Sequence, residues 1–388
     1  MKILLVSSNS SGSGGGELFF LKLAKRFVNR GEYVTIAYSS DHQFDGLARQ
    51  AADIGCEVIR FPYRRVYDRR FRSLELFFGG KAMGVSKISA DSYDVVHVSQ
   101  QNVEDGIDLV AALGRICPER LVVTIHIVER LHRLGQRLGG LRQVYPGRVY
   151  RSLRDKVRFA FVSASAEQLF CEMFGMRPRY GRIVYNGAEN PLVSLTSPTG
   201  RQALGINSAD FVVGSVGRLV EQKNYKSLIR AFAAAKAAIG NSRLVLVGDG
   251  TQRQELINLA NSLGVGESVT VTGWVSEPGR FLDIMDVFVL PSWFEGFPFA
   301  LIEALMGGKV CLASSIAPHL ECLSGEIPLL FNPANHIELG DALKRVASGD
   351  AVILKSARKA INNANSRFSM DTMIDGMIDL YRLPIGQC

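Results

Sequence analysis

Hydrophobic and polar positions along the chain fall into two repeating patterns. Short, nearly continuous apolar runs predict buried strands, and longer segments with apolar residues three or four positions apart predict amphipathic helices. In the first half the predicted strands are KILLVSSN, YVTIAYS, CEVIRFP, DVVHVS, LVVTIH and FAFVSAS. The helix GELFFLKLAKRFVNRG follows the first of them. This alternation predicts a parallel sheet that helices cover on both faces.

The pattern stops once and then restarts. NPLVSLTSPTGRQALG, residues 190–205, is rich in Pro, Ser, Thr and Gly, which is typical of a linker. The strands predicted after it are DFVVGSVG, RLVLVGDG, VTVTGW, VFVLPS and KVCLASS. We therefore predict an α/β protein with two doubly wound, Rossmann-like domains, residues 1–189 and 206–368. Ligands of such sheets bind outside the carboxyl ends of the strands, so we expect the site in a central cleft that both domains face.

The last segment, residues 369–388, contains one more amphipathic helix. Ser369 is a candidate N-cap for it. One face of this helix carries Met373, Ile374, Met377, Ile378 and Tyr381. An apolar face of this size must pack against another part of the protein.

Composition limits the class of protein. Of the 388 residues 47% are hydrophobic and 21% are charged, which is ordinary for a soluble globular chain. The six cysteines form no CxxC pair and no zinc spacing, so we expect reduced thiols and a cytoplasmic protein. No stretch approaches 18 uninterrupted apolar residues, and the amino-terminal run is too short for a signal peptide. The net charge of +8 favours anionic partners.

Two glutamates stand eight positions apart in the apolar stretch PSWFEGFPFALIEALMGGK. The spacing predicts a helix from Pro298 to Met306, so Glu295 precedes the helix and Glu303 lies inside it. Backbone N–H groups at residues 297–300 carry partial positive charge that suits a phosphate. A carboxylate beside such a site suits sugar hydroxyls. The alternative is a solvated Glu295 and a Glu303 that forms an ordinary salt bridge on the helix surface.

Two basic residues follow the first strand of the second domain, in GSVGRLVEQKN. Gly214 and Gly217 permit a tight turn, and Arg218 and Lys223 come directly after it. Two cations can neutralise a diphosphate without a metal, and the chain contains no DxD sequence. The alternative is that both are surface residues.

Together these motifs resemble a known family. GRLVEQKN, LVGDG, VTVTGW and EGFPFALIE look like the retaining glycosyltransferases of family 4, which have the GT-B fold. The resemblance covers essentially the whole chain and is strongest over residues 211–305. It implies that the helix in residues 369–388 crosses back to pack on the first domain. It implies that Arg218 and Lys223 contact a donor diphosphate, Glu303 the nucleotide ribose and Glu295 the transferred sugar. It also implies a set of donor-binding residues around them, namely Gly296, Phe297, Pro298, Phe299, Trp274, Val275, Gly15 and Gly16.

In the first domain the resemblance bears on a glycine-rich segment and a histidine. GSGGGE, residues 12–17, matches the family's loop beside the donor phosphates. The competing dinucleotide pattern GxGxxG fails, because its sixth position is Glu17, which argues against a nicotinamide oxidoreductase. His126 ends the strand LVVTIH. A lone histidine is often structural, but the resemblance implies that His126 contacts the sugar at the reaction centre. One departure is SSIAPHLECL, which lacks the family's glycines, so the shape of that loop is open.

The resemblance implies transfer of a sugar, with retention, from a nucleotide-sugar donor to a glycan or lipid-linked acceptor, in cell-surface polysaccharide or glycolipid biosynthesis. Catalysis would rest on Arg218, Lys223, Glu295 and His126, with no cofactor and no metal. The alternatives are a nucleotide-sugar epimerase or a phosphorylase on the same fold, or a non-catalytic subunit that binds sugar nucleotides.

Two arginine-rich segments remain to be explained. Residues 60–72 contain six arginines, and residues 130–158 contain eight. Such segments suggest docking on an anionic membrane surface, which would place the protein peripherally on the inner face of the membrane. The alternative is solvated charged loops. Nucleic acid is a less suitable partner, because no nucleic-acid-binding module is recognisable.

Overall fold

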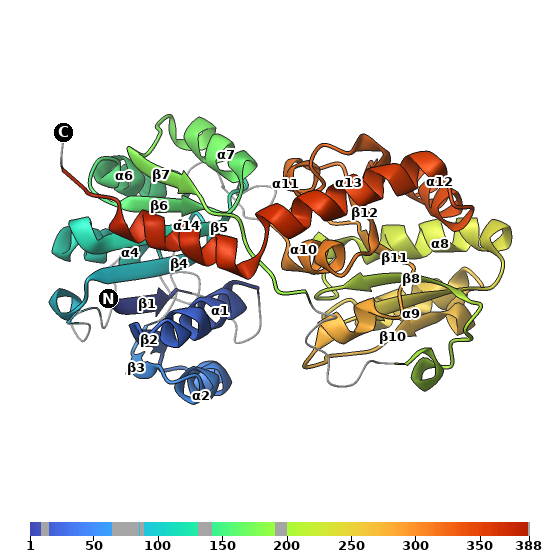
Figure 1. The fold of residues 1–388 in the computed structure, drawn as a ribbon, viewed down its shortest axis with the longest axis horizontal. Helices are drawn as coiled ribbons and strands as arrows, with labels where there is room; N and C mark the ends of the chain where they lie inside the picture. The colour runs from blue at the N-terminus through green and yellow to red at the C-terminus, as the bar shows by residue number, and fades with distance from the viewer. Residues whose placement is uncertain (9–14, 64–84, 86–88, 131–141, 191–199, 387–388) are drawn as a thin grey trace. The chain divides into compact units, whose positions relative to one another are not determined.

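The computed structural model describes two compact units (Figure 1). Unit 1 comprises Met1–Tyr185 and Met373–Cys388, and unit 2 comprises Asn186–Thr372. The described residues are 1–8, 15–63, 85, 89–130, 142–190 and 200–386. Of the predicted linker, residues 191–199 lie outside this description.

The boundary between the units lies at residue 186, a few residues before the predicted one, and hydrogen bonds explain the difference. Asn186 Nδ2 donates to the carbonyl oxygen of Phe297 at 2.7 Å, which ties the chain to unit 2 before residue 190. At the other end of the predicted linker, the Arg201 guanidinium pairs with Asp286 of the same unit at 2.9 Å.

Unit 1 is built on a seven-stranded sheet in the order β3-β2-β1-β4-β5-β6-β7. All neighbouring strands pair in parallel. The strands are β1 (Lys2–Ser7), β2 (Tyr33–Ser39), β3 (Glu57–Phe61), β4 (Val95–Asn102), β5 (Leu121–Ile127), β6 (Arg158–Phe161) and β7 (Tyr180–Ile183). The helices are α1 (Gly15–Asn29), α2 (Asp45–Asp53), α4 (Ile107–Ile116), α6 (Val144–Leu153), α7 (Ala164–Phe174) and the greater part of α14 (Met370–Arg382).

Unit 2 repeats the design with six parallel strands in the order β10-β9-β8-β11-β12-β13. The strands are β8 (Phe211–Val216), β9 (Ser242–Val247), β10 (Val269–Val271), β11 (Val287–Leu290), β12 (Val310–Ser314) and β13 (Leu330–Phe331). The helices are α8 (Tyr225–Ile239), α9 (Arg253–Ser262), α10 (Phe299–Met306), α11 (Ala317–Cys322), α12 (His336–Ala347) and α13 (Ala351–Arg367). The predicted α/β class and every predicted strand are confirmed.

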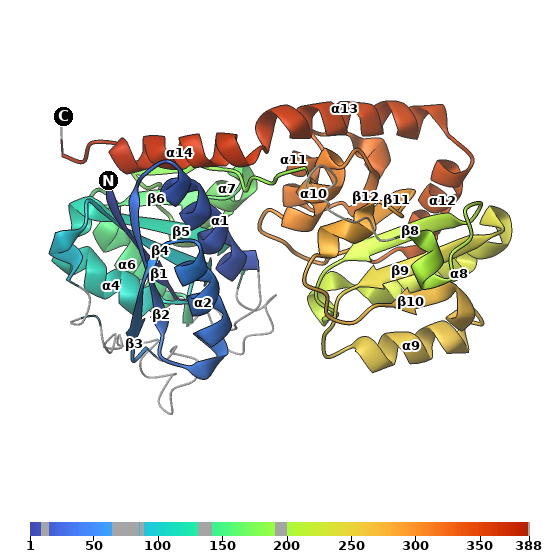
Figure 2. The same cartoon turned by 60° about the horizontal axis from the view of Figure 1, so that its bottom comes forward.

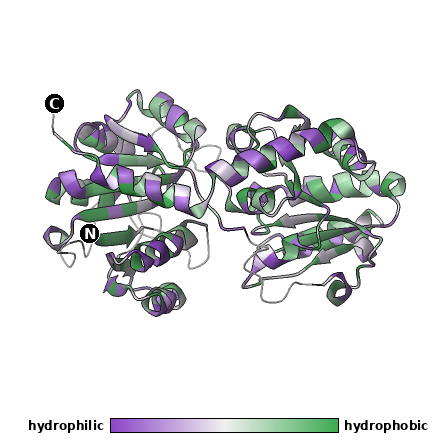
Figure 3. Cartoon of the chain, in the orientation of Figure 1, coloured by the Kyte–Doolittle hydropathy of each residue, from purple (hydrophilic) through white to green (hydrophobic). Residues whose placement is uncertain are grey.

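The hydrophobic pattern explains the cores of both units. The central strands are hydrophobic along their length and buried, while the surface helices carry one hydrophobic and one hydrophilic side (Figure 3). The free thiols of Cys56, Cys117, Cys311 and Cys322 are buried among these residues, as expected for reduced cysteines.

Helix α14 covers part of unit 1 (Figure 2). Its five predicted apolar residues are all buried. The helix begins as predicted, because Ser369 Oγ accepts a hydrogen bond from the backbone N–H of Thr372 at 3.1 Å. Near its other end Tyr381 Oη lies 2.7 Å from Nδ1 of the buried His97 in β4. The apolar face predicted from the sequence therefore forms part of the core of unit 1.

Candidate functional site

Two loops at the carboxyl edge of the unit 2 sheet are joined to each other by backbone hydrogen bonds. Leu219, after β8, donates through its N–H to the carbonyl oxygen of Asp249, after β9, at 2.8 Å. Gly248 has a φ of 142°, and a Cβ atom there would collide with the carbonyl oxygen of Gly217. Glycine is therefore needed for this close approach. The joined loops fix the backbone of the segment that carries Arg218.

Arg218 and Lys223 come from this segment but have different surroundings. Arg218 is exposed, and no hydrogen bond or ion pair joins its guanidinium to another described residue, although its backbone carbonyl accepts from the N–H of Val220. Lys223 is largely buried, and its ammonium lies 2.6 Å from Oε1 of Glu295. The alternative that both are ordinary surface residues is therefore wrong for Lys223.

Glu295 is withdrawn from solvent, with 8% of its side chain exposed. Its Oε1 also accepts a hydrogen bond from Ser292 Oγ at 2.7 Å. Burial alone would raise the pKa of this carboxyl, but the charge of Lys223 and the hydrogen bonds from Lys223 and Ser292 hold it below its ordinary value. Glu295 is thus an ionised, buried carboxylate, and the alternative of a solvated loop residue is wrong.

The segment that carries Glu295 is held on both sides of this residue. Asn224, in a left-handed conformation, donates through Nδ2 to the carbonyl oxygens of Pro291 and Pro333. Asn186 supports the carbonyl of Phe297, as described above. Within this segment Gly296, Phe297 and Pro298 are buried.

Helix α10 begins at Phe299, one residue after the predicted start. Pro298 is its N-cap residue and no side chain caps its amino terminus. The partial positive charge of the first turn is therefore not offset by a capping side chain. Phe299 opens the helix, and Glu303 lies half-buried in the second turn. The helix ends at Met306, before Gly307 and Gly308.

The loop after β10 carries two of the expected donor-binding residues, Trp274 and Val275. Thr272 Oγ1 accepts a hydrogen bond from the N–H of Gly248 at 3.2 Å, and Gly248 forms an antiparallel bridge with Gly273. Beyond this anchor, Trp274 is 72% exposed and Val275 is half-buried. An indole so exposed is unusual for a large apolar side chain and is available for stacking.

The sequence analysis did not identify His319, which lies in α11 within reach of the charges of Glu295 and Lys223. Its ring is fully buried, and Nδ1 donates to the carbonyl oxygen of Ser314 at 3.0 Å. Burial lowers the pKa of His319 to about 4, although the charge of Glu295 opposes the shift. The available signal was the departure SSIAPHLECL, where a histidine follows the proline.

In unit 1 the residues predicted to belong to the functional site are Gly15, Gly16 and His126. The two glycines form the start of α1, and the preceding residues 9–14 lie outside the description. His126, at the carboxyl end of β5, is nearly buried, and its Nε2 lies 2.9 Å from Ser99 Oγ. Burial lowers the pKa of His126 to about 4, so the imidazole is neutral near pH 7.

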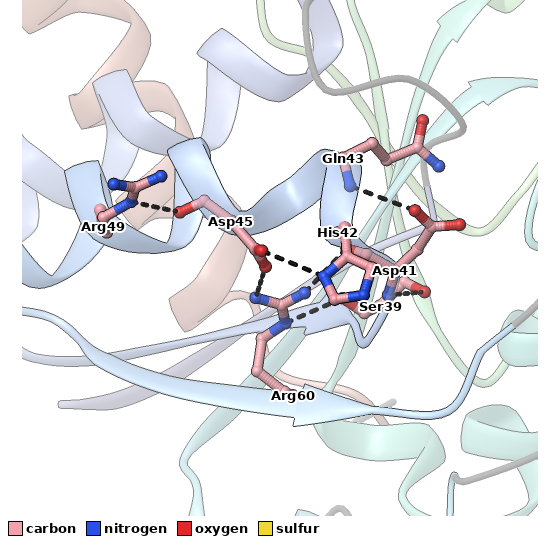
Figure 4. Close-up of polar contacts among 7 residues, drawn as sticks. All are labelled: Ser39, Asp41, His42, Gln43, Asp45, Arg49 and Arg60. Carbon is pink, nitrogen blue, oxygen red and sulfur yellow. Dashed lines mark hydrogen bonds and ion pairs between the residues drawn. The ribbon is translucent and has the colours of Figure 1, made fainter.

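Two described arginines of the arginine-rich segments are bound to carboxylates within unit 1. Figure 4 shows Arg60 bonded to Asp45 Oδ1 at 2.8 Å and to the backbone carbonyls of Ser39 and Asp41. Arg142 pairs in bidentate fashion with the fully buried Glu104. These two guanidiniums are therefore held by contacts within unit 1.

Arg158 is also buried, where it donates to the carbonyl oxygens of Leu383 and Glu119. Residues 64–72 of the first predicted segment and residues 131–141 of the second lie outside the described residues. Within the described ranges, no helix combines the length and the apolar character needed to cross a membrane.

Known proteins resemble the chain over both units. Residues 197–367 match the family model described as glycosyl transferases group 1, and residues 13–189 match glycosyltransferase family 4. An uncharacterised glycosyltransferase of Methanocaldococcus jannaschii is 25% identical over 78% of each chain. The UDP-Gal:α-D-GlcNAc-diphosphoundecaprenol α-1,3-galactosyltransferase of Escherichia coli is 25% identical over 76% of each chain.

A solved structure matches the fold over almost its full length. HepE of Anabaena, in complex with UDP-glucose, aligns with 98% of both chains at a TM-score of 0.76 and 24% sequence identity. At this level of identity the likeness concerns the fold.

Proposed function

The chain belongs to the group 1, family 4 glycosyltransferases of the GT-B fold, as predicted, and we propose that it transfers a sugar from a nucleotide-sugar donor to a hydroxyl with retention of the anomeric configuration. The observation that carries this proposal is the pairing of Lys223 with Glu295 beside the uncapped start of α10. This arrangement brings a cation, a carboxylate and helix N–H groups to one edge of one sheet. A diphosphate and a sugar need these three kinds of group.

Departure of a nucleoside diphosphate builds negative charge on its oxygens. In our proposal Arg218, Lys223 and the first N–H groups of α10 stabilise that charge, so no metal ion is required. Arg218 suits this task because its exposed guanidinium has no other partner among the described residues. Lys223 is already ordered by Glu295, so little side-chain entropy is lost when a phosphate binds.

Glu295 binds the transferred sugar in this proposal. Lys223 and Ser292 both bond to Oε1, which leaves Oε2 without a partner among the described residues. An ionised carboxylate oxygen is a strong acceptor for sugar hydroxyls. We prefer this role to covalent catalysis, because a carboxylate tied to a cation is a weakened nucleophile. Glu303 holds the ribose, and His126 contacts the reacting sugar.

The relatives support a choice of donor and acceptor. HepE is solved with UDP-glucose, and the E. coli relative is named for UDP-Gal and a diphosphoundecaprenol acceptor. We infer a UDP-hexose donor and a lipid-linked glycan acceptor, as in cell-surface polysaccharide biosynthesis.

An acceptor of this kind would be reached at an anionic membrane surface. The exposed cations in the described part of the second arginine-rich segment include Arg148, Arg154 and Lys156. Flotation with vesicles that contain anionic lipid tests this part of the proposal. Binding that falls with salt and is lost in Arg148→Glu/Arg154→Glu supports it. Absence of binding at moderate salt contradicts it.

A thermal-shift screen tests the donor. The purified protein is heated with UDP, GDP, ADP and their common sugars, with and without EDTA. A ligand at 100 times its Kd adds about 2.7 kcal/mol to the free energy of unfolding. We expect a shift with UDP and UDP-sugars that EDTA does not change and that Arg218→Ala and Glu303→Ala remove. A shift that requires a metal would contradict the metal-free site.

No shift with any nucleotide would reopen the choice of donor. Product analysis with UDP-glucose separates the remaining alternatives. An epimerase converts the donor without an acceptor and keeps its diphosphate bond, whereas a transferase releases UDP.

A further inference from the structure

Two buried histidines on neighbouring strands of unit 1 differ in one respect. In β4, His97 has both ring nitrogens bonded, Nδ1 to Tyr381 Oη and Nε2 to Thr124 Oγ1, each at 2.7 Å. In β5, His126 has a single bond, from Nε2 to Ser99 Oγ at 2.9 Å. Its Nδ1 has no partner among the described residues and is not sealed within the core. Only the second ring can therefore reach a ligand.

The position of Ser99 is fixed independently of His126. Ser99 lies in β4 and is fully buried. Its carbonyl oxygen accepts a hydrogen bond from Ser8 Oγ at 2.6 Å. On the other side, the ring of Phe19 meets the imidazole of His126 edge-on, with centroids 4.7 Å apart. The imidazole is therefore held between a fixed hydroxyl and a fixed aromatic ring.

The hydroxyl also bears on where the imidazole proton lies. A buried hydroxyl has one hydrogen to donate, and leaving that donor unsatisfied is costly. Among the described residues His126 Nε2 is the single partner of Ser99 Oγ. The hydroxyl satisfies its hydrogen if it donates to Nε2, which requires Nε2 to be unprotonated. Because burial keeps the ring neutral, the proton then lies on Nδ1.

We propose that Ser99 is a positioning residue, which selects the Nδ1–H tautomer of His126 and presents that N–H as a hydrogen-bond donor to an oxygen of the substrate. The selection of the tautomer follows from contacts within unit 1. The role toward substrate rests on the proposed function. The same logic assigns a purely structural role to His97, since it has no nitrogen left for a ligand.

Nitrogen NMR tests the tautomer without any substrate. Protein labelled with ¹⁵N-histidine gives long-range ¹H–¹⁵N correlations that distinguish the two neutral tautomers, and the spectrum of His126→Gln identifies the signals of His126. We expect Nδ1–H in the wild-type protein and a shift toward Nε2–H in Ser99→Ala. In Ser99→Thr, which keeps a hydroxyl, Nδ1–H should persist. A wild-type spectrum with Nε2–H at His126 overturns the proposal, even if neither Ser99 variant folds.

Kinetics test the consequence. Turnover of UDP-glucose should fall about tenfold in kcat for Ser99→Ala, the equivalent of one hydrogen bond to a neutral group. Ser99→Thr should restore most of it. Ser39→Ala is the matched control, because it removes another buried strand-end hydroxyl of unit 1, which bonds to the carbonyl of Tyr63 at 2.8 Å.

The two readouts separate this proposal from the proposed function. If Ser99→Ala keeps both the wild-type tautomer and the wild-type kcat, Ser99 has no positioning role. If the wild-type protein does not turn over UDP-glucose, that sugar nucleotide is not its donor, and the tautomer measurement still decides the role of Ser99.

Discussion

The ammonium of Lys223 lies 2.6 Å from Oε1 of Glu295, and the two side chains are 13% and 8% exposed. Each charge is buried only because the other is present. The sequence places them 72 residues apart, in the loops after β8 and β11. A substitution at either residue therefore affects both folding and any role in binding. Arg218 comes from the same loop as Lys223 but lacks such a partner among the described residues.

Lys223→Ala should destabilise unit 2 by about 3–5 kcal/mol, because it leaves the Glu295 carboxylate buried and unpaired. Urea unfolding measures the change. Lys223→Met combined with Glu295→Gln should recover much of the loss, since neither side chain then carries a charge. Arg218→Ala is the control and should change the free energy of unfolding by less than about 0.5 kcal/mol, while it weakens UDP binding. Equal losses of stability in the two alanine variants would contradict the buried-pair description.

Gly248→Ala should disrupt the joined loops after β8 and β9. The new Cβ would collide with the carbonyl oxygen of Gly217, and the residue has a φ of 142°. Gly264→Ala is the matched control, because Gly264 has a φ of 71° but nothing within 4 Å of a new Cβ. We expect the control to lose about 1 kcal/mol from backbone strain alone. Gly248→Ala should lose more and should also weaken nucleotide binding, as judged by thermal shift. Equal effects would show that the close approach is unimportant.

The sequence sufficed for the fold because the strands are sealed on both faces. In a chain of alternating strands and helices, a short apolar run such as the one in β1 indicates a strand that is buried on both faces. Strands β7 and β13 were missed, since one is YGRI, with little apolar character, and the other has two residues. The start of α10 at Phe299 was also predictable, because proline before an apolar helical run is a strong local signal.

Contacts between residues far apart in the sequence could not be predicted from the local sequence pattern. The sequence around Glu295 does not show that this residue forms an ion pair with Lys223. In the same way, the sequence around Arg60 does not show that Arg60 pairs with Asp45. Charge composition suggested a membrane-facing role for Arg60, but the fold uses that charge internally. His319 was missed although its partner Ser314 is only five residues away, because that contact forms only when β12 and α11 are in place.

Stability should fall in mild acid because of three buried histidines. Burial lowers the pKa of His97 to about 3 and those of His126 and His319 to about 4, from an ordinary value of 6.5. Below about pH 6.5 the unfolded chain takes up these protons and the folded chain does not, so the free energy of unfolding falls as the pH drops toward 4. Each histidine contributes at most about 1.4 kcal/mol per pH unit in that window.

Urea unfolding between pH 7 and pH 4.5 measures this slope. His319→Gln should make the slope for unit 2 shallower, because glutamine does not titrate. Unit 1 retains His97 and His126 in that variant, so the slope for its unfolding should stay unchanged. A slope for unit 2 that His319→Gln does not alter would contradict the assignment of a neutral, buried imidazole.

Trp274 should report the binding of the nucleotide base. The chain contains two tryptophans, Trp274 and Trp293, which are 72% and 41% exposed in unit 2. If the base stacks on the indole of Trp274, UDP should quench the fluorescence and shift its maximum to shorter wavelength, because the indole loses contact with water. Trp274→Phe should abolish most of the change and Trp293→Phe should retain it. Retention of the full signal in Trp274→Phe would place the base elsewhere, and a thermal shift with UDP in the same variant would show that binding itself survives.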